Sequence, residues 1–287
     1  MKNFSFLLFT SLLVSMCVGC TKPANEPIEV MTFNVRYDNP DDASNNWALR
    51  KEAAAKMINY YAPDVFGAQE VLHHQLTDLK ELLPNYEALG VGRLDGKEAG
   101  EYAPVFYNKH RFNMVRYGNF ALSEHPTHFG EKGWDAACER MATWVILQDI
   151  QTNKKFFFIN THLDHVGLVA QRMGAKLIQQ KAVELGKGLP IIVTGDFNVT
   201  AESDAFLAMT EDGLLKDSRA VAPICYGPNW SFHAFGTVSL EERPLIDHIF
   251  VSKEFKIFSS RVIDDRTKNG TGYLSDHNPV MVKLLIR

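Results

Sequence analysis

Short apolar runs alternate with longer amphipathic stretches along the chain from Glu29 onward. The apolar runs have the length and the β-branched or aromatic content of buried strands. They are residues 30–35, 64–69, 103–108, 141–150, 155–163, 189–196, 245–252 and 280–286. Residues 110–122 and 255–263 predict further strands that are joined to their neighbours without a helix.

Apolar residues also recur at helical spacing in two of the stretches between strands. The first set is Ala54, Met57, Ile58 and Tyr61, and the second set is Val166, Ala170, Met173 and Leu177. Because some strands follow one another directly, strict alternation of strands and helices is broken, which favours a mixed-sheet α+β or layered α/β fold. The sequence has no internal repeat, low-complexity block or second linker, so it predicts one domain after the N-terminal segment.

The N-terminal segment, MKNFSFLLFTSLLVSMCVGC, has one lysine, an apolar run that is short for a spanning helix, and small residues before Cys20. Its end, CVGC, resembles a bacterial lipobox, although Cys17 stands where leucine is usual. We expect residues 1–19 to be a signal peptide, residues 20–28 to be a tether after a lipidated Cys20, and residues 29–287 to be the domain. This predicts a lipid-anchored protein of the bacterial cell envelope, with an ordinary secretory signal or an uncleaved anchor as the alternatives.

Composition limits the choice of partner. The 287 residues are 46% hydrophobic and 11% aromatic, which is enough to bury a large core. The formal charge of -4 and the pI of about 6.2 provide no basic field of the kind that non-specific nucleic-acid binding needs. A long polyanion is therefore disfavoured as the substrate, although the composition does not exclude a local basic groove. Cys138 and Cys225 are the cysteines of the predicted domain, either bridged or as separate thiols.

Polar side chains gather where the predicted strands begin or end. They are Asn34, Glu70, His162, Asp164, Asp196, Asn198, Asp247, Asp276 and His277. Each has a structural explanation when taken alone, such as a turn cap or a core histidine, but together they predict one convergent site at a sheet edge. Carboxylate and carboxamide oxygens suit Mg²⁺ or Mn²⁺, which leave a position open for a phosphate oxygen. No Cys/His pairs stand at the spacing of a structural zinc site.

Taken in order, six motifs resemble those of the endonuclease/exonuclease/phosphatase superfamily. They are MTFNVR, AQE, NTHLDH, TGDFN, IDHIFVS and SDHNPV. Members of this superfamily include pancreatic-type deoxyribonucleases, abasic-site endonucleases, bacterial sphingomyelinases and inositol-polyphosphate phosphatases. The resemblance implies a four-layer α/β/β/α sandwich of two mixed sheets, with the site at one end where loops from both sheets meet.

The resemblance also implies roles for the matched residues. The implied metal ligands are Asn34, Glu70 and Asp276, and the implied catalytic residues are His162, Asp196, Asn198, Asp247 and His277. Among these, Asp196 would polarise the attacking water, Asn198 would donate to the transition state, and Asp247 would orient His277. Whether an aspartate or a histidine is the general base stays open, as does the number of metal ions.

Further residues are predicted to bind substrate. Arg140 would contact the phosphate, Glu101 would partner His162, and Trp134 and His233 would line the substrate pocket together with Trp47 and Phe232. The alternative for the two tryptophans is that they anchor loops against the sandwich.

The predicted function is a monomeric, Mg²⁺- or Mn²⁺-dependent hydrolase of phosphate esters, most concretely a phosphodiesterase on a small or head-group phosphodiester outside the cytoplasm. A broad extracytoplasmic nuclease is the first alternative, for which Arg36, Arg50, Arg140 and Arg172 would build a basic stripe. A catalytically inactive binding module is the second.

Overall fold

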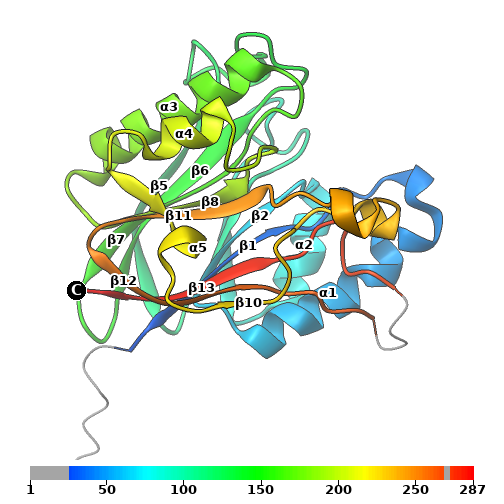
Figure 1. Ribbon diagram of the computed structural model, residues 1–287, viewed down its shortest axis with the longest axis horizontal. Coiled ribbons are helices and arrows are strands. Elements are labelled where there is room, and N and C mark those ends of the chain that lie inside the picture. Colours follow the sequence, from blue (N-terminus) through cyan, green and yellow to red (C-terminus); the bar gives the residue numbers. More distant parts are fainter. Residues whose placement is uncertain (1–25, 268–271) are drawn as a thin grey trace, which may run out of the picture.

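A computed structural model describes residues 26–267 and 272–287 of the chain. The predicted signal peptide and Cys20 lie outside the described residues, as does most of the predicted tether. Two β-sheets pack face to face, and helices cover their outer faces (Figure 1). This arrangement confirms the predicted four-layer sandwich in a single α/β domain.

The first sheet has seven strands in the order β10-β12-β13-β1-β2-β4-β3. Its strands are β1 (Ile28–Asn34), β2 (Val65–Gln69), β3 (Tyr86–Leu89), β4 (Val105–Asn108), β10 (Cys225–Tyr226), β12 (Phe255–Val262) and β13 (Val280–Ile286). β1 runs parallel to β2 and antiparallel to β13, so the sheet is mixed.

The second sheet has six strands in the order β5-β6-β7-β8-β11-β9. Its strands are β5 (Phe112–Ala121), β6 (Met141–Asp149), β7 (Lys155–His162), β8 (Ile191–Asp196), β9 (Leu215–Asp217) and β11 (Asp247–Ser252). β7 and β8 are parallel, whereas β11 is antiparallel to β8. All the predicted strands are confirmed, and the short strands β3, β9 and β10 were not predicted.

The helices form the outer layers. They are α1 (Trp47–Tyr61), α2 (His73–Leu82), α3 (Leu168–Gly186), α4 (Asp204–Thr210) and α5 (Ser218–Val221), with 3₁₀ helices at Pro40–Asn45, Ala234–Gly236 and Leu240–Glu242. The first two pack on the seven-stranded sheet, and α3 and α4 lie over the six-stranded sheet (Figure 1). In the described part of the chain no helix is long and apolar enough to cross a bilayer.

The main core lies between the sheets. Val30, Val65 and Val282 of one sheet meet Phe158 and Ile192 of the other, and all five are buried. Two further apolar clusters fill the spaces beneath the two helical layers. This stacking leaves the ends of the strands, rather than their faces, free to build a site.

The predicted helical stripe around Ala170 is partly wrong. Val166 precedes α3 and is 60% exposed, and Met173 is 37% exposed. The helix instead turns small residues toward the sheet: a Cβ at Gly174 would lie 3.2 Å from Leu163. Close approach to the sheet selects small residues here, so the buried face is not the most apolar one. The other predicted stripe, on α1, is confirmed.

Candidate active site

Strand register brings the predicted site residues to one end of the sandwich. Asn34 ends β1 beside Gln69, which ends the parallel strand β2 and precedes Glu70. In the other sheet, His162 pairs with Asp196 at the ends of the parallel strands β7 and β8. Because the carboxyl ends of parallel strands meet at the same edge, these polar side chains converge.

The late strands reach the same edge from the opposite direction. Asp247 begins β11 directly opposite Asp196, since β11 is antiparallel to β8. β13 begins at Val280, which pairs with Thr32 near the end of β1. His277 therefore lies just outside the same edge, as the motif order predicts.

Backbone strain marks three residues of this edge. Arg36, Glu70 and Asn198 have φ values of 59°, 60° and 53°, a left-handed conformation that residues with a Cβ rarely adopt. Each lies within two residues of a strand end, so the unusual conformation bends the chain out of the sheet direction. Such strain is retained where the surrounding structure holds a side chain in a required position.

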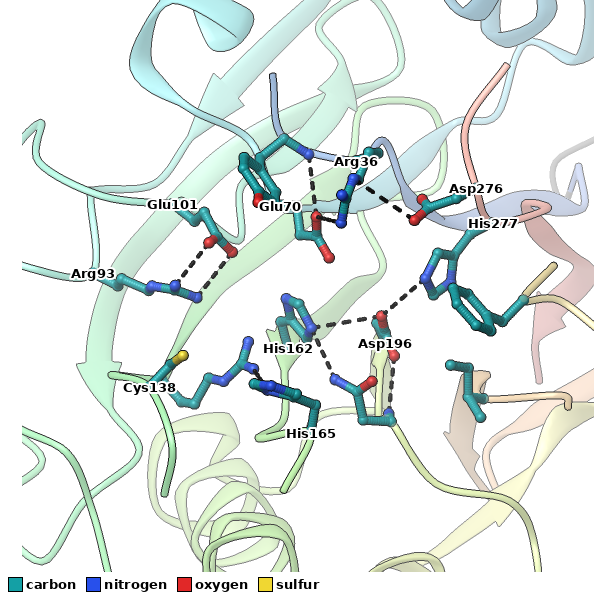
Figure 2. Close-up of a pocket in the computed structure, with 15 residues that line it drawn as sticks. Arg36, Glu70, Arg93, Glu101, Cys138, His162, His165, Asp196, Asp276 and His277 are labelled. Atoms are coloured by element: carbon teal, nitrogen blue, oxygen red, sulfur yellow. Dashed lines mark hydrogen bonds and ion pairs between the residues drawn. The ribbon is translucent and has the colours of Figure 1, made fainter. Parts of the chain in front are cut away.

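A pocket of about 450 Å³ opens at this edge (Figure 2). Its lining includes the predicted residues Glu70, Glu101, Arg140, His162, Asp196, Asn198, Asp276 and His277. Asn34 and Asp247 are buried behind the wall, bonded to side chains that line it. Trp134 and His233 are not among the lining residues.

Asp247 and His277 form a buried carboxylate–imidazole pair. Asp247 Oδ2 lies 2.8 Å from His277 Nδ1, and His277 Nε2 lies 3.6 Å from Asp196 Oδ2. Burial opposes the charge on the imidazole, but the carboxylates of Asp247 and Asp196 outweigh it and hold the pKa of His277 well above its usual range. His277 is therefore a charged donor at neutral pH.

Asp196 differs from an ordinary aspartate. Burial, together with the nearby charge of Asp247, raises the pKa of Asp196 to about 7, although His277 acts in the opposite direction. A carboxylate that titrates near neutral pH is matched to accepting a proton from water. Its raised pKa therefore makes Asp196 a candidate general base.

Asn34 connects the two halves of the site. Its Nδ2 donates to Glu70 Oε1 at 3.0 Å and to Asp196 Oδ2 at 2.9 Å, while its Oδ1 accepts from the Arg36 backbone N–H at 2.9 Å. In this arrangement Asn34 positions the two carboxylates, and its oxygen is used by the backbone. The oxygen has a second lone pair, so ligation of a metal ion by Asn34 stays a prediction.

The donor set around Glu70 fits a hard divalent cation. Burial and the charge of Glu70 raise the pKa of Asp276, with His277 opposing them. Arg36 lies 3.9 Å from Glu70 Oε2 and 3.8 Å from Asp276 Oδ2. Glu70 also has oxygen and nitrogen atoms of Asp196 and His162 within 4.8 Å. Such a cluster of carboxylates gains from a bound cation, and oxygen ligands are those that Mg²⁺ and Mn²⁺ prefer.

His162 has the opposite charge state from His277. Burial, assisted by the charge of Arg140, lowers the pKa of His162 well below its usual range. Asn198 Nδ2 lies 3.0 Å from His162 Nε2 and also donates to the Leu163 carbonyl at 3.0 Å. Since Asn198 offers a proton to Nε2, the neutral ring carries its own proton on Nδ1. Both amide protons of Asn198 thus hold the site in this structure, and its role as a transition-state donor stays a prediction.

Glu101 is held by a residue that the sequence analysis did not identify. Arg93 makes two hydrogen bonds to its carboxylate, at 2.9 and 2.7 Å (Figure 2). The expected partner, His162, contacts Asn198 instead. The Arg93–Glu101 pair forms one wall of the pocket.

Arg140 lines the pocket, and its guanidinium group is held in place by Asp164 and His165. Its Nε donates to Asp164 Oδ2 at 3.3 Å, and one terminal nitrogen lies 2.9 Å from His165 Nδ1. Its other terminal nitrogen, Nη1, is buried without a hydrogen-bond partner in the described part of the chain. A buried guanidinium donor without a partner beside a pocket fits an anionic group of a substrate.

Asp164 is structural, although its strand-end position marked it as a candidate. It accepts backbone N–H groups from Ala137, Cys138, Val166 and Gly167. Burial opposes ionisation, but these donors outweigh it and hold the pKa of Asp164 well below its usual range. A permanent carboxylate therefore anchors the loop that carries Arg140.

Two predicted pocket residues lie elsewhere. His233 is fully buried and packs 4.5 Å from the Tyr273 ring, and burial lowers its pKa to about 3, so it is a neutral core histidine. The backbone N–H of Trp134 donates to Glu124 outside the pocket. Trp47 is also an anchor, because its buried ring donates to Asp78 at 2.8 Å.

The predicted basic stripe does not form. Arg50 is 2% exposed and donates to backbone carbonyls, including that of Leu274, and burial lowers its pKa to about 10. Arg172 lies on α3 and does not line the pocket, which leaves Arg36 and Arg140. Phe232 does line the pocket as predicted, with its ring 4.9 Å from the ring of His277.

For several residues that line the pocket, no motif or strand-end position in the sequence indicated a place in the site. They are Tyr37, Arg93, Cys138, His165 and Ile246. Cys138 and Cys225 are both free thiols, which answers the question of a bridge between them.

The fold and the site define a metal-dependent phosphoesterase of the α/β/β/α sandwich class. The chain belongs to the Endonuclease/Exonuclease/phosphatase family, whose sequence profile matches residues 31–277. Members of this family are phosphoesterases and nucleases that depend on divalent metal ions.

Similar structures cover nearly the whole domain. An endonuclease/exonuclease/phosphatase from Bacteroides vulgatus is 42% identical with a TM-score of 0.88, covering 91% of this chain and 99% of that chain. A mannosyl-6-phosphatase from Bacteroides thetaiotaomicron VPI-5482 is 39% identical with a TM-score of 0.85, covering 90% of this chain and 99% of that one.

A curated relative matches less of its own length. The 2',5'-phosphodiesterase 12 of Bos taurus is 25% identical over 189 residues, which are 58% of this chain and 31% of the relative. The chain thus spans about a third of that protein.

The site contains the groups that hydrolysis of a phosphate ester requires. A divalent ion held by Glu70 and Asp276 would neutralise charge on the phosphoryl oxygens. Asp196 would accept the proton of the attacking water, and His277 would donate to the developing charge or to the leaving oxygen. Arg140 would hold a phosphate oxygen, and burial around these groups would strengthen each interaction.

Proposed function

We propose that the protein hydrolyses the phosphate ester of a small, polyhydroxylated molecule of the sugar-phosphate class, with Mg²⁺ or Mn²⁺ as its metal, at the bacterial cell envelope. The observation that carries this proposal is the pocket itself, which has a volume of about 450 Å³ and is lined mostly by charged and polar residues. That size suits a small phosphorylated molecule.

The chemistry of the pocket supports a polar leaving group. The Arg93–Glu101 pair presents both a donor and an acceptor surface, which suits hydroxyl groups. Aromatic surface in the lining is limited to Tyr37 and Phe232. Stacking platforms and a basic track are the usual features of single-strand nucleic-acid binding. Of the four arginines proposed for such a track, Arg50 and Arg172 do not line the pocket, so no continuous track forms. The 39% identity to a protein named mannosyl-6-phosphatase agrees with this choice.

A small phosphodiester is the second candidate. It is supported by the similarity to a 2',5'-phosphodiesterase over 189 residues. Both candidates use the same metal and base, and they differ in whether the phosphate carries one or two organic groups.

A substrate panel tests the proposal. Mannose 6-phosphate, glucose 6-phosphate, bis(p-nitrophenyl) phosphate, a 2',5'-linked oligoadenylate, sphingomyelin and single-stranded DNA are assayed with Mg²⁺ and with EDTA. We expect kcat/KM for a hexose phosphate to exceed that for DNA by about 100-fold or more, the factor that one or two charge-assisted hydrogen bonds supply. Faster turnover of the diesters would favour the second candidate, and faster turnover of DNA would overturn the proposal.

A pair of arginine variants sharpens the assay. Arg140→Gln removes the unpartnered buried donor and is expected to lower kcat/KM for every phosphate ester that is hydrolysed. Arg172→Gln is the matched control, because Arg172 lies on α3 outside the pocket. Equal losses in both variants would contradict a phosphate-binding role for Arg140.

A further inference from the structure

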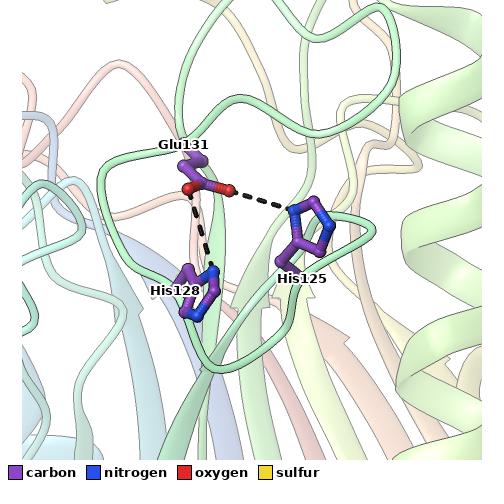
Figure 3. Close-up of side chains that lie close together, drawn as sticks. All are labelled: His125, His128 and Glu131. Atoms are coloured by element: carbon purple, nitrogen blue, oxygen red, sulfur yellow. Dashed lines mark hydrogen bonds and ion pairs between the residues drawn. The ribbon is translucent and has the colours of Figure 1, made fainter.

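A second cluster of metal-binding side chains lies on the loop between β5 and β6 (Figure 3). His125 Nδ1 is 3.2 Å from one carboxylate oxygen of Glu131, and His128 Nδ1 is 3.8 Å from the other. One ligand atom from each residue lies within 4.8 Å of the others. The three side chains are at least half exposed, so ions in solution reach them.

The backbone of this loop is held in place without the side chains. The His128 N–H donates to the His125 carbonyl at 2.9 Å, which closes a turn whose second residue is Pro126. Proline presets the backbone conformation that this turn position needs. Two residues further on, the Gly130 N–H donates to the Arg93 carbonyl at 3.1 Å. Binding of an ion therefore has to order only three side chains, which lowers its entropic cost.

The donor set selects a different class of ion from the one in the active site. Two imidazole nitrogens and one carboxylate oxygen suit Zn²⁺, Co²⁺, Ni²⁺ or Cu²⁺, whereas Mg²⁺ prefers oxygen ligands alone. In a tetrahedral zinc site with bonds of about 2.1 Å, ligand atoms are about 3.4 Å apart. The histidine nitrogens lie 3.2 and 3.8 Å from different oxygens of Glu131, and one ligand atom from each residue lies within 4.8 Å of the others, so small side-chain rotations bring three atoms to that spacing.

We propose that His125, His128 and Glu131 form a second metal site, which binds Zn²⁺ or a similar transition-metal ion and leaves one coordination position for water. None of the three residues lines the active-site pocket. A glutamate as third ligand, six residues after the first histidine, lies outside the cysteine and histidine patterns of structural zinc sites, so the sequence pattern alone did not indicate this site. An exposed ion pair with no metal affinity is the alternative.

Metal titration of the full-length protein without an affinity tag tests the proposal. Saturating Mg²⁺ is present throughout, and Zn²⁺ binding is followed by competition with a chromophoric chelator. Co²⁺ is titrated in parallel, because its visible absorption reports tetrahedral nitrogen and oxygen ligands. The amount of Zn²⁺ that binds at the active site should be the same in all variants, since the substitutions lie outside the pocket.

We expect the double variant His125→Ala/His128→Ala to lose one equivalent of Zn²⁺ and the Co²⁺ absorption that belongs to it. Glu131→Gln should weaken Zn²⁺ binding at the same site by about ten-fold or more. Loss of a residue that only orients a ligand already costs about ten-fold in metal affinity, and Glu131 is proposed as a direct ligand. His110→Ala is the matched control, since His110 is an exposed histidine elsewhere on the surface.

Added Zn²⁺ should raise the melting temperature of the wild-type protein and of His110→Ala more than that of the double variant, because a ligand that binds only the folded state stabilises it. An unchanged number of Zn²⁺ equivalents in the double variant would overturn the proposal. An equal loss in His110→Ala would overturn it as well, because the binding would then be unspecific.

Discussion

Replacement of Asp247 by asparagine tests the catalytic pair most directly. Asp247 Oδ2 lies 2.8 Å from His277 Nδ1, and both side chains are buried. In the wild-type protein the carboxylate helps to hold the pKa of His277 well above its usual range. Without that charge, burial is opposed only by the carboxylates of Asp196 and Asp276, so the pKa of His277 falls and its imidazole becomes a weaker charged donor.

The expected size of the effect follows from this contact. A hydrogen bond to a charged group contributes about 1.5–3 kcal/mol, which is about 10–150-fold in rate. The lower pKa and looser orientation of His277 add to this, up to the factor of about 10²–10⁴ that a positioned proton-transfer group contributes. The same substitution in the serine-protease triad costs about 10⁴-fold and sets the upper limit. We therefore expect Asp247→Asn and His277→Ala each to lower kcat by about two to four orders of magnitude.

The assay is a double-variant cycle measured at saturating metal and substrate. If Asp247 acts through His277, the double variant is barely slower than the slower single variant, because residues that act as a unit are strongly non-additive. Melting temperatures are measured in parallel. Multiplicative rate losses, combined with a collapsed melting temperature for Asp247→Asn, would refute the pair and leave Asp247 as a structural acid.

Three further predictions concern the metal, the base and the anchor. Glu70→Gln should lower turnover by about 100-fold or more at saturating Mg²⁺ while the melting temperature is kept, because a bound metal supplies several kcal/mol of charge stabilisation; near-wild-type turnover would reject Glu70 as a ligand. Asp196 has a pKa raised to about 7, so in metal-free protein its carboxyl should bind a proton as the pH falls below 7, and carboxyl NMR showing titration near 4 would contradict this. Added metal should lower that pKa, since a cation favours the carboxylate. Cys20→Ser should abolish labelling by a radioactive fatty acid, and labelling that persists would reject Cys20 as the anchor.

The strand-end residues could be predicted because their signal is local. A buried strand is a short apolar run, and a polar residue directly after it needs a reason to be there. Asn34, His162 and Asp196 all have this pattern, and the structure brings them together. The strand pattern alone allowed either a mixed-sheet α+β fold or a layered α/β fold. The order of the six motifs along the sequence indicated the four-layer sandwich.

Other features depend on contacts between distant segments. Arg93 reaches the pocket from a loop with no strand pattern, and its partner Glu101 could not be paired with it from spacing. His233 has the residue type of a site histidine, but Trp230 and Tyr273 enclose its ring. The inward face of α3 was misassigned because close packing on the sheet favours small residues over apolar ones.

The carboxylate of Asp164 connects the pocket wall to the two residues that lead into α3. Its donors come from residues 137–138 on one side and from residues 166–167 on the other. Opening of the wall would break the turn that leads into the helix in the same event, so we expect the two segments to form one cooperative unit of local unfolding. Amide hydrogens on both sides should then exchange with solvent at similar rates. A wall tied to the approach of a helix in this way is held in place before any substrate binds.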